Sequence, residues 1–157
     1  MVTTTVWTLG TFPSRRAAFA ADNCSDLIFR NLTLKTDCKG QAEGLLVNGE
    51  RNYFENVHVI GDGDALQANG SCYWQNCVID GGGDTILGRG PSFFNHCTIT
   101  SYGAFMWIRN TSENHGNVFV SCHLDTSKRH PLMRQLDPIQ DAALIGRYSD
   151  SHWVLGW

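Results

Sequence analysis

Apolar and polar positions alternate along most of the chain, in short runs that recur at regular intervals. Each run begins with an aromatic residue, has a polar residue two positions later and ends in a triplet whose first and third residues are apolar. The five runs are Phe29–Leu34, Phe54–Val59, Trp74–Ile79, Phe94–Ile99 and Phe119–Leu124. Their first residues are separated by 25, 20, 20 and 25 positions. Short alternating runs with a repeat in the low twenties are typical of stacked β coils, not of helical arrays.

The aligned runs form columns of similar residues. The apolar columns are Phe29, Phe54, Trp74, Phe94, Phe119; Leu32, Val57, Cys77, Cys97, Cys122; and Leu34, Val59, Ile79, Ile99, Leu124. A polar column contains Asn31, Asn56, Asn76, His96 and Ser121. In a solenoid each coil covers its neighbour, so the apolar columns would merge into one core. The sequence therefore predicts an all-β protein, a right-handed single-stranded parallel β-helix of about five to seven coils.

The segments around the repeats are less regular but fit a single domain spanning the chain. Thr3–Trp7 and Ala17–Ala20 have the composition of strands in an earlier coil. Residues 125–143 break the pattern with two prolines, which predicts a long loop, and Ala142–Gly146 then returns to a strand pattern. The apolar end, Trp153–Trp157, has no evident cap, and solenoids need capped ends. We expect a domain truncated at both ends.

Composition and net charge limit the classes of partner that the chain is expected to bind. At 157 residues, with 42% hydrophobic and 17% charged residues, the chain has enough apolar side chains for a packed core. Its formal net charge of -3 argues against nucleic acid and anionic membranes as partners. No apolar run approaches the length of a membrane helix. The first ten residues have neither a basic start nor a long apolar stretch, so no signal peptide is predicted.

The six cysteines do not suggest a metal or disulfide framework. Cys77, Cys97 and Cys122 belong to an inward column, where a thiol behaves as a small buried hydrophobe. No C-x-x-C pair occurs, and the other three cysteines lack zinc spacing.

Two aspartates carry the candidate chemistry. Asp64 lies ten residues after Phe54, and Asp84 lies ten residues after Trp74, so they should occupy the same place in consecutive coils. Strands stack about 4.8 Å apart, and carboxyl groups this close cannot both ionise at low cost, which supplies one acid and one base. Gln41 should fall near the same face one coil earlier, where its amide could stabilise an oxyanion.

Two other interpretations of this acidic stretch remain open. Asp and Gly also suit turns, so the pair could serve only the coil corners. Asp62 and Asp64 could supply oxygen ligands to calcium, although neither the EF-hand loop nor the glycine-rich calcium repeat is matched.

The ordered motifs resemble those of one enzyme family, the pectin methylesterases. The matching segments are Gln41–Val47, Gly63–Leu66, Gly83–Gly88, Phe94–Ile99 and Leu144–Arg147. The resemblance extends over residues 11–147 in the family's order. It implies the same parallel β-helix as the repeats.

The resemblance also implies a mechanism without metal or organic cofactor. Asp84 matches the nucleophilic aspartate that attacks the methyl-ester carbonyl of galacturonan. Asp64 matches the acid that protonates departing methanol and then activates water. Gln41 matches an oxyanion-hole glutamine, and Arg147 matches the arginine that orients the nucleophile.

Three departures from the family pattern stand out. Gly63 occupies the position of a second oxyanion-hole glutamine, and loss of one such donor typically costs about 10²–10³ in rate. Thr85 and Leu87 replace aromatic residues beside the nucleophile. After Arg147 the family's Pro-Trp is missing, although Trp153 could fill the space.

Aromatic residues near the aspartates are candidates for sugar binding. Tyr102, Phe105 and Trp107 follow the Ile99 run and could form a platform beside the pair, with Trp153 as a fourth member. Packing under a loop is the alternative role for the first three.

The leading hypothesis is therefore an esterase that releases methanol from methyl-esterified polygalacturonan. A first alternative, favoured by Gly63, is a weak or inactive homologue that binds acidic polysaccharide. A second is an esterase or thioesterase with another substrate on the same scaffold. A secreted, cell-wall or periplasmic location is implied by the resemblance alone.

Overall fold

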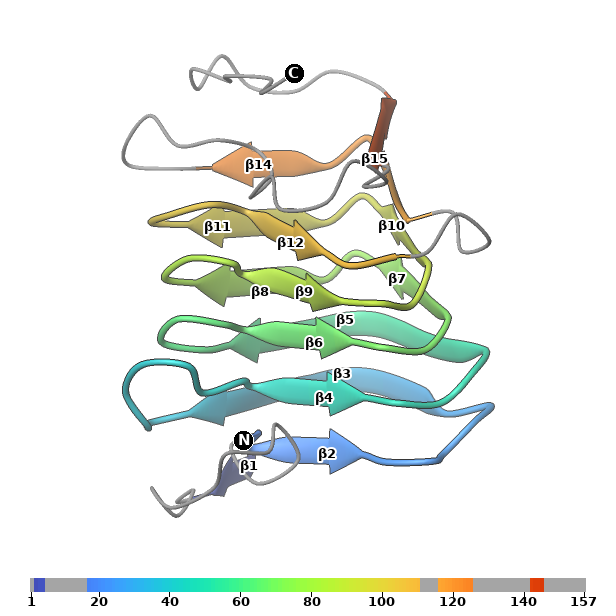
Figure 1. The fold of residues 1–157 in the computed structure, drawn as a ribbon. Helices are drawn as coiled ribbons and strands as arrows, with labels where there is room; N and C mark the ends of the chain where they lie inside the picture. The colour runs from blue at the N-terminus through green and yellow to red at the C-terminus, as the bar shows by residue number, and fades with distance from the viewer. Residues whose placement is uncertain (1, 5–16, 111–115, 126–141, 146–157) are drawn as a thin grey trace.

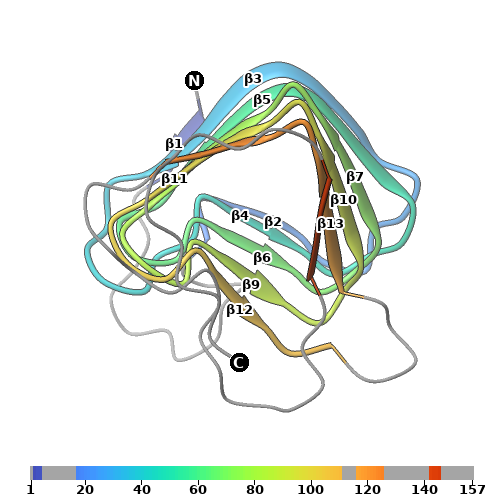
Figure 2. The same ribbon diagram turned by 90° about the horizontal axis from the view of Figure 1, so that it is seen from above.

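The computed structural model describes residues 2–4, 17–110, 116–125 and 142–145. Strands and turns make up these residues, and the strands pair in parallel throughout. They wind into a parallel β-helix with about 4 turns, which confirms the predicted fold class. Figure 1 shows the coils stacked along one axis, and Figure 2 shows three walls around an interior when the stack is viewed along that axis.

Each wall consists of strands from successive coils. The first wall, a separate five-stranded sheet, contains β2 (Phe19–Ala21), β4 (Leu45–Val47), β6 (Leu66–Ala68), β9 (Ile86–Gly88) and β12 (Met106–Ile108). The second wall contains β1 (Val2–Thr4), β3 (Ile28–Thr36), β5 (Asn52–Ile60), β8 (Val78–Gly81), β11 (Thr98–Ser101) and β14 (His123–Asp125). The third wall contains β7 (Cys72–Gln75), β10 (Ser92–Asn95), β13 (Asn117–Val120) and β15 (Ala142–Ile145). The long strands β3 and β5 pass around the corner between the last two walls, where later coils break into two strands.

The predicted apolar columns are present in register. Phe54 pairs with Trp74, Trp74 with Phe94, and Phe94 with Phe119. The third column pairs in the same way, and in the second column Leu32 pairs with Val57. Rings in the aromatic column stack with centroids 3.9 to 5.7 Å apart. These columns form one continuous core, because each coil presents the same side chain at the same place.

The predicted polar column forms the corner between the second and third walls. All five of its residues have positive φ, from 50° to 56°. This left-handed backbone conformation turns the chain, and Asn tolerates it better than most residues. The amide of Asn56 also donates to Asn31 Oδ1 of the previous coil, at 3.0 Å. The corner thus explains why the column is polar.

The cysteines are free thiols at all six positions in the structure. Cys77, Cys97 and Cys122 are at most 2% exposed and belong to the core. Backbone N–H groups of Cys77 and Cys97 donate to the sulfur of the next coil, at 3.4 Å. Hydrogen bonds with its two neighbours and burial together raise the pKa of Cys97.

Other predictions concern the margins of the coil stack. Strand β15 agrees with the predicted return to a strand at 142–146. Most of the predicted loop at 125–143, the capping of the chain ends and coils beyond the observed turns lie outside the described residues. The described part of the chain has no helix long and apolar enough to span a membrane.

Candidate functional site

The candidate site lies where the chain enters the first wall. Within this wall the middle residue of each strand faces outward, since Leu45 and Val47 belong to the interior cluster whereas Leu46 does not. The backbone N–H groups of Ala65 and Leu66 both donate to Thr85 O, at 3.1 and 2.9 Å. This bulge lets two consecutive residues, Ala65 and Leu66, face the interior. Asp64, just before the bulge, therefore falls on the outer side.

Asp64 and Asp84 occupy equivalent positions in consecutive coils. Leu66 pairs with Ile86, and each aspartate lies two residues before its member of that pair. Neighbouring strands are about 4.8 Å apart, so the spacing argument from the sequence agrees with the register.

The two aspartates have different surroundings. Asp64 is only 7% exposed, whereas Asp84 is partly exposed and has a φ of 47°. A left-handed conformation at a residue other than glycine is uncommon and costs free energy, and such residues cluster at functional sites. The pair thus combines a buried carboxyl group with a more accessible one.

A third carboxyl group, Glu43, continues this column. It lies two residues before Leu45, which pairs with Leu66, so it precedes its strand as Asp64 does. Its side chain is fully buried, at 0% exposure. Sequence spacing counted from the aromatic residue missed Glu43, because the first coil has a longer turn. Counting back from the start of the strand would have found it.

Gln41 lies close to the residue that precedes Asp64. The carbonyl oxygen of Gly40 accepts a hydrogen bond from Gly63 N at 2.9 Å. A Cβ atom built at Gly63 would lie 2.7 Å from Gly40 O and 3.8 Å from the Cα atom of Gln41. The side chain of Gln41 is exposed. Glycine at position 63 therefore has a packing reason, since the neighbouring coil leaves no room for a side chain.

Asp62 interacts with the neighbouring turn. Its carboxylate accepts hydrogen bonds from Lys39 Nζ and Gly40 N, both at 2.8 Å. The Lys39 hydrogen bond, followed by that from Gly40, holds the pKa of the Asp62 carboxyl below its usual range. Among the described residues, no group of three or more His, Cys, Asp or Glu side chains could hold a metal ion. The observed partners of Asp62 are thus a lysine and a backbone amide.

The three described members of the predicted aromatic platform differ in exposure. Phe105 is 1% exposed and belongs to the core cluster, so its proposed role in sugar binding is wrong. Phe105 directly precedes Met106, as Ala65 directly precedes Leu66, and all four residues belong to the interior cluster. The backbone N–H of Ile86 donates to Phe105 O at 2.9 Å. Tyr102 is 65% exposed. Trp107 is partly exposed and pairs with Leu87 on the outer face of the first wall.

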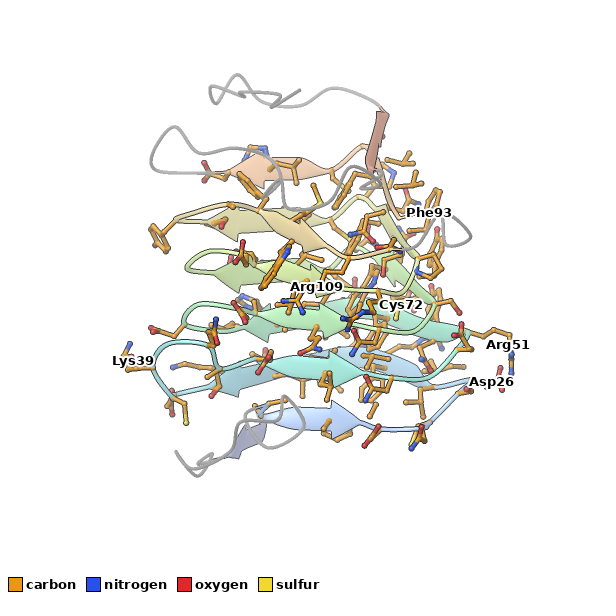
Figure 3. The ribbon with its side chains drawn as sticks, in the orientation of Figure 1. Asp26, Lys39, Arg51, Cys72, Phe93 and Arg109 are labelled. Carbon is orange, nitrogen blue, oxygen red and sulfur yellow. The ribbon has the colours of Figure 1, made fainter. Side chains whose placement is uncertain are left out.

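Arg109 is a residue that the sequence reasoning missed. Its guanidinium carbon lies 3.3 Å from the centroid of the Trp107 ring, a cation–π contact. Figure 3 shows Arg109 on the side of the solenoid formed by the first wall. The available signal in the sequence was that Arg109 lies two residues after Trp107, because residues two apart on an extended chain share a face.

Arg147 and Trp153, the remaining predicted site residues, lie outside the described residues. Gln67 faces outward between Leu46 and Leu87 and is 7% exposed, and within the described part of the chain its Oε1 atom has no hydrogen-bond partner. The described site thus consists of the Glu43–Asp64–Asp84 column, the nearby backbone of Gln41, and an outer face that ends at Trp107 and Arg109.

Comparison with known proteins supports the fold. No family model matches the chain, and no curated protein sequence matches it. A solved structure of a pectin methylesterase in complex with a hexasaccharide is similar, with a TM-score of 0.71 and 18% sequence identity. The match covers 90% of this chain and 58% of the other, so the chain corresponds to little more than half of that protein. At this identity the likeness establishes a shared parallel β-helix fold.

Proposed function

We propose that the protein is a carbohydrate esterase that hydrolyses the methyl esters of polygalacturonan. The observation that carries the proposal is the register of Leu66 with Ile86, because Asp64 and Asp84 each lie two residues before a member of this pair. The fold shared with a pectin methylesterase supports the choice of substrate. A polymer of this kind lies outside cells, so we also propose an extracellular or periplasmic place of action.

Asp84 is the nucleophile in this proposal because it is the more exposed carboxyl group of the pair. Its carboxylate attacks the ester carbonyl carbon and forms a tetrahedral oxyanion. The oxyanion collapses to an acyl-enzyme anhydride as the bond to the methoxy group breaks. The amide of Gln41 stabilises the oxyanion, and Arg147 orients Asp84.

Asp64 is the acid and base in this proposal. Burial disfavours the ionised form of a carboxyl group, and Asp64 is 7% exposed. It gives its proton to the departing methoxy group, which leaves as methanol. As a carboxylate it then takes a proton from water, which attacks the anhydride, releases the galacturonate carboxylate and restores Asp84. The second proton of this water is released to solvent when the new galacturonic acid group ionises, so the reaction balances without a cofactor.

The test is methanol release from highly methylated pectin. Asp84→Asn should lower the rate by at least about a thousandfold, because it removes the nucleophile. Asp62→Asn is the matched control, since Asp62 is a nearby turn carboxylate whose observed partners are Lys39 and Gly40. Equal rates for the native protein and Asp84→Asn would refute the proposal.

A binding-only homologue is the second candidate, and Gly63 favours it. The position lacks a side-chain donor, and its backbone N–H is already bonded to Gly40 O. A Gly63→Gln variant would force a backbone contact of 2.7 Å, so we expect it to destabilise the fold instead of restoring an oxyanion hole. Pectin binding without methanol release would support this candidate. Hydrolysis of a generic ester but not of pectin would indicate another substrate.

A further inference from the structure

A second surface feature lies on the third wall, away from the carboxyl groups. The outward residues Tyr53, Tyr73, Phe93 and Val118 pair with one another in successive coils. They line a groove with a volume of about 490 Å³, which runs along the solenoid axis. Figure 3 shows Phe93 and Cys72 on this side of the molecule, with Arg51 and Asp26 farther along the axis. We name this feature the aromatic groove, defined by the four outward residues.

The rings in the aromatic groove are parallel but offset. Centroids lie 5.6 Å apart for Tyr53 and Tyr73 and 5.4 Å apart for Tyr73 and Phe93, with interplanar angles of 4° in both cases. Atoms in contact need only about 3.5–4 Å, so the additional separation reflects an offset that leaves part of each ring uncovered. Phe93 is 37% exposed. The groove thus presents a regular series of apolar surfaces, one in each coil.

Hydrogen-bonding side chains follow the aromatic residues along one edge of the groove. Glu55, Gln75 and Asn95 pair in successive coils, two residues beyond the rings. The amide of Asn95 donates to Tyr73 Oη at 3.3 Å and to Gln75 Oε1 at 2.8 Å. A row of apolar ring surfaces beside a row of one carboxylate and two amides matches a chain of sugar rings, which have apolar C–H faces and hydroxyl edges.

Arg51 and Arg30, beside the aromatic groove, are each paired with a carboxylate, and Glu50 accepts a hydrogen bond from Ser71 N at 3.1 Å. Arg51 makes two 2.7 Å hydrogen bonds to Asp26, and Arg30, which lies over the Tyr53 ring, pairs with Glu55 at 2.7 Å. These pairs leave little net charge to attract a polyanion, because each positive side chain faces a negative one. The groove is therefore suited to an uncharged polymer more than to a free polyuronate.

We propose that the aromatic groove binds an extended, largely uncharged polysaccharide chain, such as methyl-esterified galacturonan, along the solenoid axis. The repeat of one ring in each coil is close to the length of one sugar residue in an extended glycan. Successive sugar rings can therefore meet successive aromatic residues. This surface is on a different wall from Asp64 and Asp84, and binding there does not require the proposed esterase activity.

The test measures binding of highly methylated pectin by calorimetry in the Asp84→Asn background. This background keeps the polymer methylated if the protein is an esterase. Tyr73→Ala and Phe93→Ala should each weaken binding about tenfold, since each removes one ring contact. His123→Ala is the matched control because His123 is an exposed ring on β14, in another wall. De-esterified polygalacturonate should bind more weakly than methylated pectin.

Several results would overturn the proposal. Unchanged affinity in both Tyr73→Ala and Phe93→Ala would do so, as would equal binding of the de-esterified polymer. If Tyr73→Ala is poorly folded by circular dichroism, Tyr73→Leu keeps an apolar side chain without the ring and should also weaken binding. Sedimentation that shows a dimer dissociated by Phe93→Ala would assign the groove to self-association.

The outcome is separable from that of the esterase proposal. Methanol release that depends on Asp84, together with pectin binding that is unaffected by Tyr73→Ala, would refute only the groove proposal. Pectin binding that is weakened by Tyr73→Ala, without methanol release by the native protein, would refute only the esterase proposal.

Discussion

Two aromatic columns one residue apart make an instructive pair. Phe54, Trp74 and Phe94 are each 0% exposed and stack inside the solenoid. Their preceding neighbours Tyr53, Tyr73 and Phe93 stack outside it, on the same strands and in the same register. The alternation of a β-strand alone separates the columns.

The difference shows that stacking is not equivalent to core formation. Inside, each ring is enclosed by the other apolar columns, and this burial contributes to the stability of the fold. Outside, rings of similar spacing remain partly exposed and line a groove. The inner column should therefore affect unfolding, and the outer one should affect binding. Four predictions test that distinction.

The largest effect is expected at the inner column. Trp74→Ala should lower the free energy of unfolding by about 3–5 kcal/mol, because it removes a fully buried ring and leaves a cavity. Tyr73→Ala is the matched variant in the outer column and should cost under about 1.5 kcal/mol, the range of an aromatic pair contact. Urea denaturation measures both. Similar losses would erase the distinction between the columns.

The corner that follows both columns gives the next effect. Asn56 adopts a φ of 53° and donates to Asn31, so Asn56→Ala should cost about 1–2 kcal/mol. Asn56→Gly accommodates the same backbone conformation and should cost less. Thermal unfolding of the two variants provides the comparison. A larger loss of stability in Asn56→Gly than in Asn56→Ala would show that the backbone conformation is not the main contribution of Asn56.

Alkaline pH tests the enclosure of the inner side at Cys72. Burial, and secondarily the charge of Glu50, raises the pKa of the Cys72 thiol from 9.0 to about 12. Because the pKa is higher in the folded state, the contribution of this thiol to stability is fully present below the pKa of the unfolded state. It is lost as pH rises from 9 to 12. Native stability should therefore fall by about 1 kcal/mol more than that of Cys72→Ala between pH 8 and pH 10. Parallel urea curves at the two pH values measure this, and identical losses would indicate that the thiol is accessible.

The smallest effect concerns the polar atom in the inner column. Trp74 Nε1 is buried and has no hydrogen-bond partner among the residues that the structure describes. Trp74→Phe removes this costly donor while it sacrifices some ring volume, so the unfolding free energy should stay within about 1 kcal/mol of the native value. The same denaturation assay applies. A loss near that of Trp74→Ala would mean that the indole shape itself is required.

Much of the fold could be predicted because the repeats are in register. The aromatic column, the thiol column and the polar corner were all visible as aligned residues, and the pairing of Phe54 with Trp74 confirms the alignment. The positions of Asp64 and Asp84 followed from the same spacing. Glu43 was not predicted, because the longer turn in the first coil shifts the number of residues between Phe29 and the start of the next strand. Phe105 was misplaced because Phe105 and Met106 both belong to the core, which breaks the alternation expected of a strand.

By itself, the sequence determined which residues stack, because a solenoid repeats one local environment in every coil. Only the tertiary structure decided what each stack faces. The bulge directs Ala65 and Leu66 together into the core and leaves Asp64 outside. The close approach of Gly40 to position 63 excludes a side chain there. Both effects arise from contacts between coils some twenty residues apart, and a linear pattern does not contain those distances.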